Sequence, residues 1–339
     1  MIPRVLFVLK KHEGSGGPLH SSSGLRNSAR FVADMLNSEN IATASVAIVV
    51  DGNGIDAEVF KFKPDVVVLE AIWCPPDKLA ELVTIYPKIR WVVRIHSEIP
   101  FLAHEGMALQ YLAAYASITN VKVSANSPVA TRDLGYLNPV FLPNFYPVVQ
   151  TTSDAVATAA SMDHLKVGCF GAVRPMKNQL AQAFAAVEYA KRKRVTYLSF
   201  YVNASRPEQG GENVLKNLRS FFASQPSGYQ LIEVSWSDRT AFLALVAEMD
   251  ICMSVSFSET FCIVAADAVS QKIPVVVSPE VFWVDDDVQV DPTDIQAIAD
   301  TIGHALGIWK GMLLRENLNG LRKYNQQSVV DWKQFLRSS

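Results

Sequence analysis

The sequence has few cysteines, and their spacing argues against the common cysteine-based sites. Four cysteines occur among 339 residues, and none stands two or three residues from another, as paired zinc ligands do: they are Cys74, Cys169, Cys252 and Cys262. Three of the four lie in apolar runs. We therefore expect buried, reduced thiols rather than disulfides or metal ligands.

Net charge, long apolar segments and repeats are also lacking. The formal net charge of -2 gives no overall attraction to nucleic acid or to an anionic membrane, although such an average can hide a local basic face. No apolar run reaches the roughly 18 residues that cross a bilayer, and a strand-like run begins at Arg4, too early for a signal peptide. We found no internal repeat of solenoid length and no low-complexity tract. The expectation is a cytoplasmic protein without a membrane span.

Short apolar runs alternate with helical patterns along the whole chain, which is long enough for two domains. The first half contains "RVLFVL", "ASVAIVV", "DVVVLE", "RWVVRI" and "VKVSAN", and the second half contains "LKVGCFG", "TYLSFYV", "YQLIEV", "DICMSV" and "IPVVVS". Runs that are apolar on both faces and separated by helices indicate parallel sheets covered on both sides. We predict an α/β fold of two doubly wound, Rossmann-like domains that face a central cleft.

Helical spacing and composition set the expected boundaries. One apolar helical face comprises Leu25, Ala29, Val32 and Leu36, and another comprises Leu180, Phe184 and Val187. The weakly patterned segment 148–164 is expected to be a linker between domains at 1–147 and 165–310. Helical patterns fill 311–339, and we expect these C-terminal helices to pack back toward the first domain.

Two carboxylates stand eight positions apart in "SFSETFCIVAADAVSQKIPVVVS", residues 256–278. Glu259 precedes a helix expected to begin near Phe261, whose positive end would face the ligand of Glu259. Asp267 lies in the apolar run "CIVAADAV", where a carboxylate needs a partner. Eight helical residues rise about 12 Å, so the pair is suited to the sugar and the ribose of a nucleotide-sugar. The alternative is one acid favoured by the helix dipole and another on a solvated face.

A basic turn follows the first predicted strand of the second half. In "GCFGAVRPMKN", residues 168–178, a strand ends in glycine and a helix begins near Asn178. Arg174 and Lys177 flank the turn, an arrangement suited to neutralising a diphosphate leaving group. The alternative is a pair of solvated surface cations.

The N-terminal loop "KKHEGSGGPLHSSSG" follows the first strand. It does not match the dinucleotide-binding fingerprint, because Leu19 takes the place of the third glycine. We expect an acceptor-binding lid that uses His12, Glu13, Gly16 and Gly17. A plain surface loop is the alternative.

The two second-half stretches together resemble the donor domain of retaining, nucleotide-sugar-dependent glycosyltransferases of the GT-B fold, of the family 4-like Glu-x7-Glu type. The resemblance implies that Glu259 orients the transferred sugar and that Asp267 binds the ribose. It also implies that Arg174 and Lys177 hold the diphosphate, with no metal and no cofactor. The co-substrate would be a nucleotide-sugar, most simply a UDP-linked one.

The resemblance extends into the first half. "LPNF", residues 142–145, resembles the family's Pro-Asn-Gly segment, and "RIHSEIP" matches the family's cleft histidine at His96. The resemblance implies that His96 belongs to the catalytic set and lines the pocket of the donor sugar, and we expect it on the same rim as Glu70. Without the resemblance, a histidine at a strand end is more simply a hydrogen-bonded bystander. The resemblance adds Asn144, Gly171, Ser258, Thr260 and Phe261 as expected donor contacts.

The sequence also departs from the family pattern. The second acid is one methylene shorter, because Asp267 replaces glutamate. Thr260 and Cys262 replace two glycines, which limits how closely the backbone approaches the donor. Arg174 stands three residues nearer to the lysine turn than in the commonest pattern.

The acceptor is suggested only by the first-half stretches "SGLRNSARFVADMLNSENI" and "IHSEIPFLAHEG". They resemble a tailed-phage subgroup that places sugars on hydroxymethylated pyrimidines of phage DNA, which implies a double-stranded DNA partner in the host cytoplasm. Arg26 and Arg30, one helical turn apart, would contact phosphates together with Lys10 and Lys11. The alternatives are a bacterial-type transferase acting on a polysaccharide, lipid or protein, and a degenerate module that binds a nucleotide or DNA without catalysis.

Two further charged runs have simpler interpretations. Asp285 and Asp287 in "VDDDV" spell the Asp-x-Asp of metal-dependent transferases of another fold, but they fall in a late loop, and we predict no metal site there. "KRKR", residues 191–194, closes a predicted helix, where the helix dipole favours cations. A nucleic-acid contact is the alternative for that run.

Overall fold

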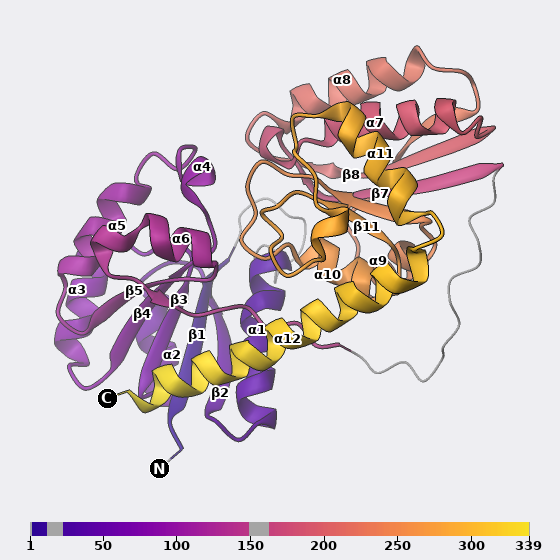
Figure 1. Ribbon diagram of the computed structural model, residues 1–339. Coiled ribbons are helices and arrows are strands. Elements are labelled where there is room, and N and C mark those ends of the chain that lie inside the picture. Colours follow the sequence, from indigo (N-terminus) through magenta and orange to yellow (C-terminus); the bar gives the residue numbers. More distant parts are fainter. Residues whose placement is uncertain (1, 12–22, 149–162, 339) are drawn as a thin grey trace. The chain divides into compact units, whose positions relative to one another are not determined.

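The computed structural model describes residues 2–11, 23–148 and 163–338 and divides into two units. Unit 1 comprises Met1–Pro147 and Tyr324–Ser339, and unit 2 comprises Val148–Lys323. Each unit has a sheet with helices on both faces (Figure 1).

The described strands of unit 1 form one parallel sheet in the order β2-β1-β3-β4-β5-β6. They are β1 (Arg4–Lys10), β2 (Thr43–Val49), β3 (Val66–Glu70), β4 (Arg90–Ile95), β5 (Val121–Ala125) and β6 (Val140–Phe141). The five strands predicted for this half are confirmed. The sequence did not predict β6, because two residues are too few to show a periodic pattern.

Helices cover both faces of this sheet and enclose a separate apolar core on each. They are α1 (Ser23–Ser38), α2 (Gly54–Phe62), α3 (Pro76–Ile85), α4 (Ile99–Leu102), α5 (Ala108–Ser117), α6 (Pro128–Asp133) and the 3-10 helix η1 (Gly135–Leu137). The predicted inner face of α1 is confirmed, since Ala29, Val32 and Leu36 are buried in one of these cores and Leu25 packs against it.

The described strands of unit 2 form a second parallel sheet in the order β11-β10-β7-β8-β9. They are β7 (His164–Val173), β8 (Tyr197–Pro207), β9 (Tyr229–Glu233), β10 (Ile251–Ser254) and β11 (Val275–Val277). The helices are η2 (Pro175–Lys177), α7 (Gln179–Arg192), α8 (Gly211–Ala223), α9 (Arg239–Ala247), α10 (Ile263–Ser270), η3 (Asp286–Val288) and α11 (Ile295–Ala305). The five predicted strands are again confirmed.

One predicted helical face in unit 2 is wrong in part. Val187 is buried in α7, but Phe184 is 42% exposed. Its ring stacks on Phe221 of α8, with 3.9 Å between centroids. The buried surface of α7 includes small side chains such as Ala183 and Ala186, which allow a helix to approach its sheet closely.

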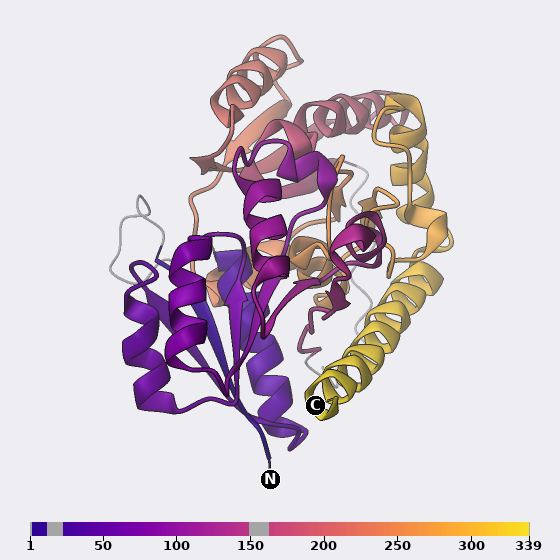
Figure 2. The ribbon, with the colours of Figure 1, turned by 90° about the vertical axis from the view of Figure 1, so that its left-hand side faces the viewer.

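The C-terminal helical patterns form a single helix, α12 (Lys310–Arg337) (Figure 2). Its first part belongs to unit 2, where Gly320 passes a loop so closely that a Cβ atom would stand 2.2 Å from the carbonyl oxygen of Trp283. Its last part, from Tyr324, belongs to unit 1, where the indole nitrogen of Trp332 donates to the carbonyl oxygen of Pro143 at 2.9 Å. One helix therefore contributes to both units.

Strand order reverses at one place in each sheet, and open α/β sheets bind ligands at the carboxyl ends of the strands there. In unit 1 the reversal lies between β1 and β3, and β3 ends at Glu70. In unit 2 it lies between β7 and β10. The turn with Lys177 follows β7, and the segment with Glu259 follows β10. The fold therefore brings the two predicted donor motifs to the expected binding edge of unit 2.

The remaining general expectations concern thiols and membrane spans. All four cysteines are buried free thiols, as predicted. Burial raises the pKa of Cys74, Cys169 and Cys262 to about 12, so these thiols stay protonated at neutral pH. Within the residues that the structure describes, none of the helices combines the length and the apolar character needed to cross a bilayer.

Candidate functional site

Lys177 and Glu259 are in direct contact at the carboxyl edge of the unit 2 sheet. The ammonium nitrogen of Lys177 contacts Oε1 of Glu259, and the hydroxyl of Ser256 donates to the same oxygen at 2.9 Å. The side chains of Lys177 and Glu259 are 15% and 10% exposed. The structure thus joins the cation predicted for the diphosphate and the acid predicted for the sugar in one partly accessible pair.

The two segments that carry this pair are held by contacts of their own. The backbone N–H of Phe257 donates to the carbonyl oxygen of Met176 at 2.9 Å. The side chain of Asn178 donates to the carbonyl oxygens of Val255 and Pro292, at 3.2 and 2.7 Å. These bonds fix both segments whether or not Lys177 and Glu259 are paired.

Gly171 occupies a backbone conformation that favours glycine, with φ of 103°. Its N–H donates to Oδ1 of Asn203 on β8 at 2.8 Å, and Asn203 is 2% exposed. A Cβ atom added to Gly171 would meet its nearest neighbour in Val264, at 3.9 Å. Backbone conformation, rather than crowding, therefore calls for a glycine at this strand end.

Arg174 lies at a different acid from Lys177. Its Nη1 is 3.5 Å from Glu208, whose other carboxylate oxygen accepts a 2.6 Å hydrogen bond from Arg206. The Arg206 guanidinium lies over the ring of Trp236, 4.7 Å from its centroid. The sequence did not predict this group, in which Arg206 lies in β8, Glu208 follows that strand and Trp236 follows β9.

Asp267 is buried in α10, and its side chain is 3% exposed. Its Oδ1 accepts a 2.8 Å hydrogen bond from Nη1 of Arg239, the first residue of α9. The predicted need for a partner is confirmed, although the partner was not predicted. The predicted helical spacing of the two acids is wrong, because α10 begins at Ile263 and Glu259 precedes it. The 12 Å helical rise therefore does not apply.

The residues between Glu259 and α10 differ in exposure. Ser258 and Thr260 are partly exposed. Phe261 is 1% exposed, and its carbonyl oxygen accepts a 2.7 Å hydrogen bond from the indole of Trp283. Cys262 has φ of 61°, in the left-handed region, and precedes the helix directly. Phe261 packs within unit 2, and its predicted donor contact stays a prediction.

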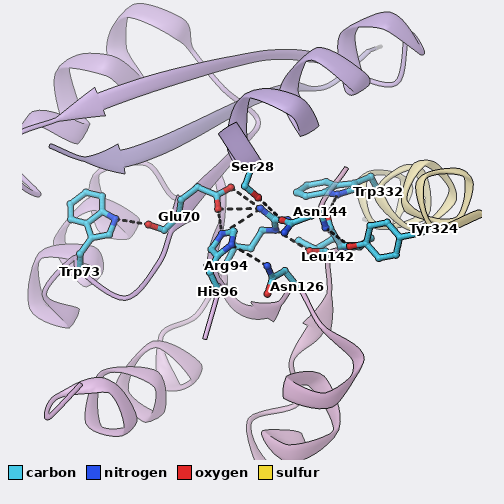
Figure 3. A network of polar contacts seen from close by, with 11 residues as sticks. Ser28, Glu70, Trp73, Arg94, His96, Asn126, Leu142, Asn144, Tyr324 and Trp332 are labelled. Atoms are coloured by element: carbon cyan, nitrogen blue, oxygen red, sulfur yellow. Dashed lines mark hydrogen bonds and ion pairs between the residues drawn. The ribbon is translucent and has the colours of Figure 1, made fainter. Parts of the chain in front are cut away.

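A buried polar network lies at the carboxyl ends of β3 and β4 in unit 1 (Figure 3). Nη1 of Arg94 donates to both carboxylate oxygens of Glu70, at 3.1 Å each, and both side chains are fully buried. Nε of Arg94 donates to the carbonyl oxygen of Leu142 at 2.9 Å, and Nη2 donates to Oδ1 of Asn144 at 2.5 Å. Arg94 therefore ties two strand ends to the segment after β6.

His96 joins the network through both ring nitrogens. Nε2 contacts the carboxylate of Glu70, and Nδ1 lies 3.1 Å from Nδ2 of Asn126. With the Asn126 amide in this orientation its nitrogen donates and Nδ1 accepts, which places the ring proton on Nε2. The His96 side chain is 11% exposed. Since both nitrogens are engaged, the ring suits lining a pocket better than transferring a proton.

The environment holds Glu70 ionised and His96 neutral. Burial by itself would raise the pKa of Glu70, but the Arg94 guanidinium and the His96 ring together lower it. Burial lowers the pKa of His96, Glu70 opposes that shift, and Arg94 adds to it. A second proton on the ring would also need to displace the amide of Asn126.

Asn144 is 4% exposed and fully engaged in unit 1. Its Oδ1 accepts from Arg94 and from the hydroxyl of Ser28, and its N–H donates to the hydroxyl of Tyr324 at 2.9 Å. Tyr324 lies in α12. The segment predicted to bind the donor therefore anchors the C-terminal helix, and its donor contact stays a prediction.

No protein-family model matches the chain, and no curated protein matches it. Solved structures do. The UDP-forming α,α-trehalose-phosphate synthase from Burkholderia xenovorans in complex with glucose-6-phosphate is 12% identical, with a TM-score of 0.70 over 98% of this chain and 99% of that one. The N-terminal domain of Candida albicans trehalose-6-phosphate phosphatase is 12% identical, with a TM-score of 0.67 over 99% and 96%. A trehalose-6-phosphate protein from E. coli bound with UDP-2-fluoro glucose is 10% identical, with a TM-score of 0.62 over 98% and 97%.

The chain has the GT-B fold. The predicted fold class, an α/β chain of two parallel-sheet Rossmann-like domains, is confirmed, and one C-terminal helix stands where several were predicted. These identities of 10 to 12% establish the fold and leave the site to be argued from its own residues.

The predicted acceptor residues of this GT-B chain are only partly described. His12, Glu13, Gly16 and Gly17 lie outside the described residues. Arg30 is exposed on α1 and lies 3.6 Å from Asp34 one turn on, both side chains being 67% exposed. Arg26 is partly buried on the same helix, and Lys10 is exposed at the end of β1.

The charged runs at Asp285 to Asp287 and at 191–194 contribute contacts within unit 2. The carboxylate of Asp285 accepts the backbone N–H of Asp287 at 3.0 Å, which caps η3. Lys191 donates to Gln225, and Arg192 pairs with Glu188 and Asp300. These side chains serve the local structure.

Proposed function

We propose that this chain is a nucleotide-sugar-dependent glycosyltransferase that retains the configuration of the transferred sugar. The observation that carries the proposal is the contact of Lys177 with Glu259 at the point where the unit 2 sheet reverses its strand order. A cation beside a carboxylate suits a ligand that joins a phosphate to hydroxyl groups. Similar folds support it, since one is a UDP-forming synthase and another holds UDP-2-fluoro glucose.

In the proposed reaction, the bond between the anomeric carbon and a diphosphate oxygen breaks while a bond to the acceptor oxygen forms. The acceptor hydroxyl passes its proton to the departing phosphate oxygen. Lys177 stabilises the negative charge that grows on the diphosphate, and Glu259 orients the sugar by accepting hydrogen bonds from its hydroxyls. Ser256 fixes the Glu259 carboxylate. We expect no metal requirement, so a chelator should leave the rate unchanged.

Other contacts follow from the same donor position. Arg174, which shares Glu208 with Arg206, would extend the cationic surface for the diphosphate. We propose that Asp267 acts at the ribose together with Arg239. Arg239 is the more accessible partner, with 27% of its side chain exposed against 3% for Asp267.

For the acceptor we propose a hydroxymethylated pyrimidine in DNA, on the strength of the first-half resemblance. Lys10 and Arg30, both exposed, would contact phosphates, with Arg26 beside them. Polysaccharide, lipid and protein acceptors are the competing class. A protein that binds nucleotide or DNA without turnover is the non-enzymatic alternative.

One panel tests these proposals. Donor consumption is measured for several nucleotide-sugars with hydroxymethylated DNA, with unmodified DNA, with glucose-6-phosphate and without an acceptor. We expect consumption that depends on hydroxymethylated DNA and that falls about 100-fold or more in Lys177→Met, the loss typical of one transition-state donor. Donor consumption that depends on a different acceptor would show that the acceptor belongs to another class than hydroxymethylated DNA. Salt-sensitive DNA binding without any donor consumption would overturn the enzymatic proposal.

A further inference from the structure

In unit 2, the two charged residues predicted to contact the ligand, Lys177 and Glu259, neutralise each other's charge. The ammonium group of Lys177 contacts Glu259, whose Oε1 also accepts from Ser256. The exposed fractions of 15% and 10% make the pair reachable from solvent but poorly screened by it. An incoming ligand meets a closed ion pair rather than a free cation.

A nucleoside diphosphate without a sugar is a poor ligand for such a pair. Its phosphates compete with Glu259 for the Lys177 ammonium, and they also bring negative charge close to the Glu259 carboxylate. A carboxylate only accepts hydrogen bonds, so it gains nothing from a phosphate oxygen that offers no hydrogen.

An attached sugar changes this balance. Sugar hydroxyls donate hydrogen bonds to the carboxylate and compensate it for the loss of the ammonium contact. Lys177 is then available to the diphosphate. We propose that Glu259 is a specificity-determining residue that favours the nucleotide-sugar over the bare nucleoside diphosphate and promotes release of that product by pairing again with Lys177.

This inference rests on the proposed function, because it requires that Lys177 face the diphosphate. It does not require that the pair support the fold. The Phe257 to Met176 bond and the Asn178 bonds hold the two segments independently. A Glu259→Gln variant, which keeps the shape and removes the charge, is therefore expected to fold normally.

Calorimetric titrations of UDP, inorganic pyrophosphate and UDP-2-fluoro glucose into wild type and Glu259→Gln test the inference. Removing one charge-assisted contact is worth about tenfold in affinity. We therefore expect the variant to bind UDP and pyrophosphate about tenfold more tightly. UDP-2-fluoro glucose should bind the variant no more tightly than wild type. In a Lys177→Met background the Glu259→Gln change should give a clearly smaller gain, because only the repulsion between Glu259 and the phosphates is then removed and not the competition for the ammonium group.

Glu248→Gln, an equal change of charge at an exposed site after α9, is the matched control and should alter none of the three affinities. If Glu259→Gln binds UDP and pyrophosphate no more tightly than a wild type that does transfer sugar, the inference is wrong and the proposed function stands. If wild type binds none of the three probes and consumes no donor, the proposed function fails first.

Discussion

Both units carry acidic and basic side chains at the carboxyl edge of a parallel sheet, but they use them differently. In unit 1 the Glu70 and Arg94 side chains are completely buried, and Arg94 directs its donors to the protein itself. In unit 2 Lys177 and Arg239 keep 15% and 27% of their side chains exposed. The same pairing chemistry forms a closed structural junction in unit 1 and partly accessible ion pairs in unit 2.

The difference follows from what surrounds each pair. The network of unit 1 is covered by α12, through Tyr324 bonded to Asn144 and Trp332 stacked 5.6 Å from the Arg94 guanidinium. A buried polar network of this kind favours one arrangement, and the hydrogen bonds of Arg94 are directed to protein groups rather than to a ligand. The pairs of unit 2 are partly accessible, and we expect them to exchange partners when a ligand binds. Mutations in the unit 1 network should therefore lower the stability more than mutations in the unit 2 pairs. Mutations in the unit 2 pairs should mainly change ligand binding.

The largest effect on stability is expected for Arg94→Met. Removing the guanidinium leaves Glu70 charged and buried without its main partner, which costs about 3–5 kcal/mol. Urea unfolding followed by tryptophan fluorescence and by far-UV circular dichroism measures the loss. Lys177→Met is the comparison in unit 2 and should cost less, about 1–2 kcal/mol, because Glu259 keeps its hydrogen bond from Ser256 and some access to solvent. Equal losses of stability in both variants would contradict the distinction between a structural network in unit 1 and an accessible ion pair in unit 2.

Arg239→Met should have an intermediate effect. Asp267 is as buried as the acids of unit 1, yet its partner is partly exposed. A buried carboxylate that loses its charged partner costs about 1–3 kcal/mol. The double variant Arg239→Met with Asp267→Asn should recover part of that loss in urea unfolding, because no buried charge remains. Failure of the double variant to recover any stability would show that Arg239 acts through packing alone.

The strands of both units were predictable because each is apolar on both faces, a pattern that only a covered parallel sheet explains. The short β6 strand and the continuity of α12 were not. Two residues carry no period, and the helical patterns of 311–339, expected to form several helices, form one. Asn325 is used there, since its side chain accepts from the N–H of Tyr146 and donates to the Tyr146 carbonyl.

A residue of the candidate site was predictable only where the short stretch of sequence around it showed a recognisable pattern. Glu259 and Lys177 were found from their neighbours within two short stretches. Arg239 and Asn203 were not, because each meets its partner, Asp267 or Gly171, through the fold alone, 28 and 32 positions away. Local patterns report strands and turns, whereas the partner of a buried charge depends on which loops the topology brings together.

A smaller effect concerns pH and is expected in unit 1. The pKa of His96 lies below its unfolded value of 6.5. As the pH falls below 6.5, the unfolded chain binds a proton at this ring and the folded chain does not. Stability that is complete above pH 6.5 is therefore lost on acidification, down to the folded pKa, by at most about 1.4 kcal/mol per pH unit.

The free energy of unfolding of wild type and His96→Gln, measured by urea titration at pH values from 7.5 to 5, tests this dependence. The variant should lose less stability across that range than wild type. His104→Gln, at an exposed position, is the control and should follow wild type. Parallel profiles for wild type and His96→Gln would mean that the ring is protonated in the folded protein.

The smallest effects concern two residues with positive φ, one in each unit, that lie near the acidic residues in the sequence. Ala71 follows Glu70 with φ of 73°, and Cys262 precedes α10 with φ of 61°. A left-handed conformation costs a residue with a Cβ atom about 1 kcal/mol more than glycine. Ala71→Gly gives up only a partly exposed methyl group, so it should raise the stability of unit 1 by up to about 1 kcal/mol. Cys262→Gly also loses a sulfur that is buried in unit 2, worth about 1 kcal/mol, so its net effect should be near zero.

Cys262→Val separates the two contributions at that position. Valine keeps apolar volume but places a branched side chain in the left-handed region, so it should unfold at lower urea than either Cys262→Gly or wild type. Urea midpoints of all four proteins give the comparison. If Ala71→Gly and Cys262→Gly shift the midpoint equally, the sulfur contributes nothing to packing in unit 2. If valine is tolerated as well as glycine, the backbone before α10 can relax, and the segment that carries Glu259 is less rigid than its hydrogen bonds imply.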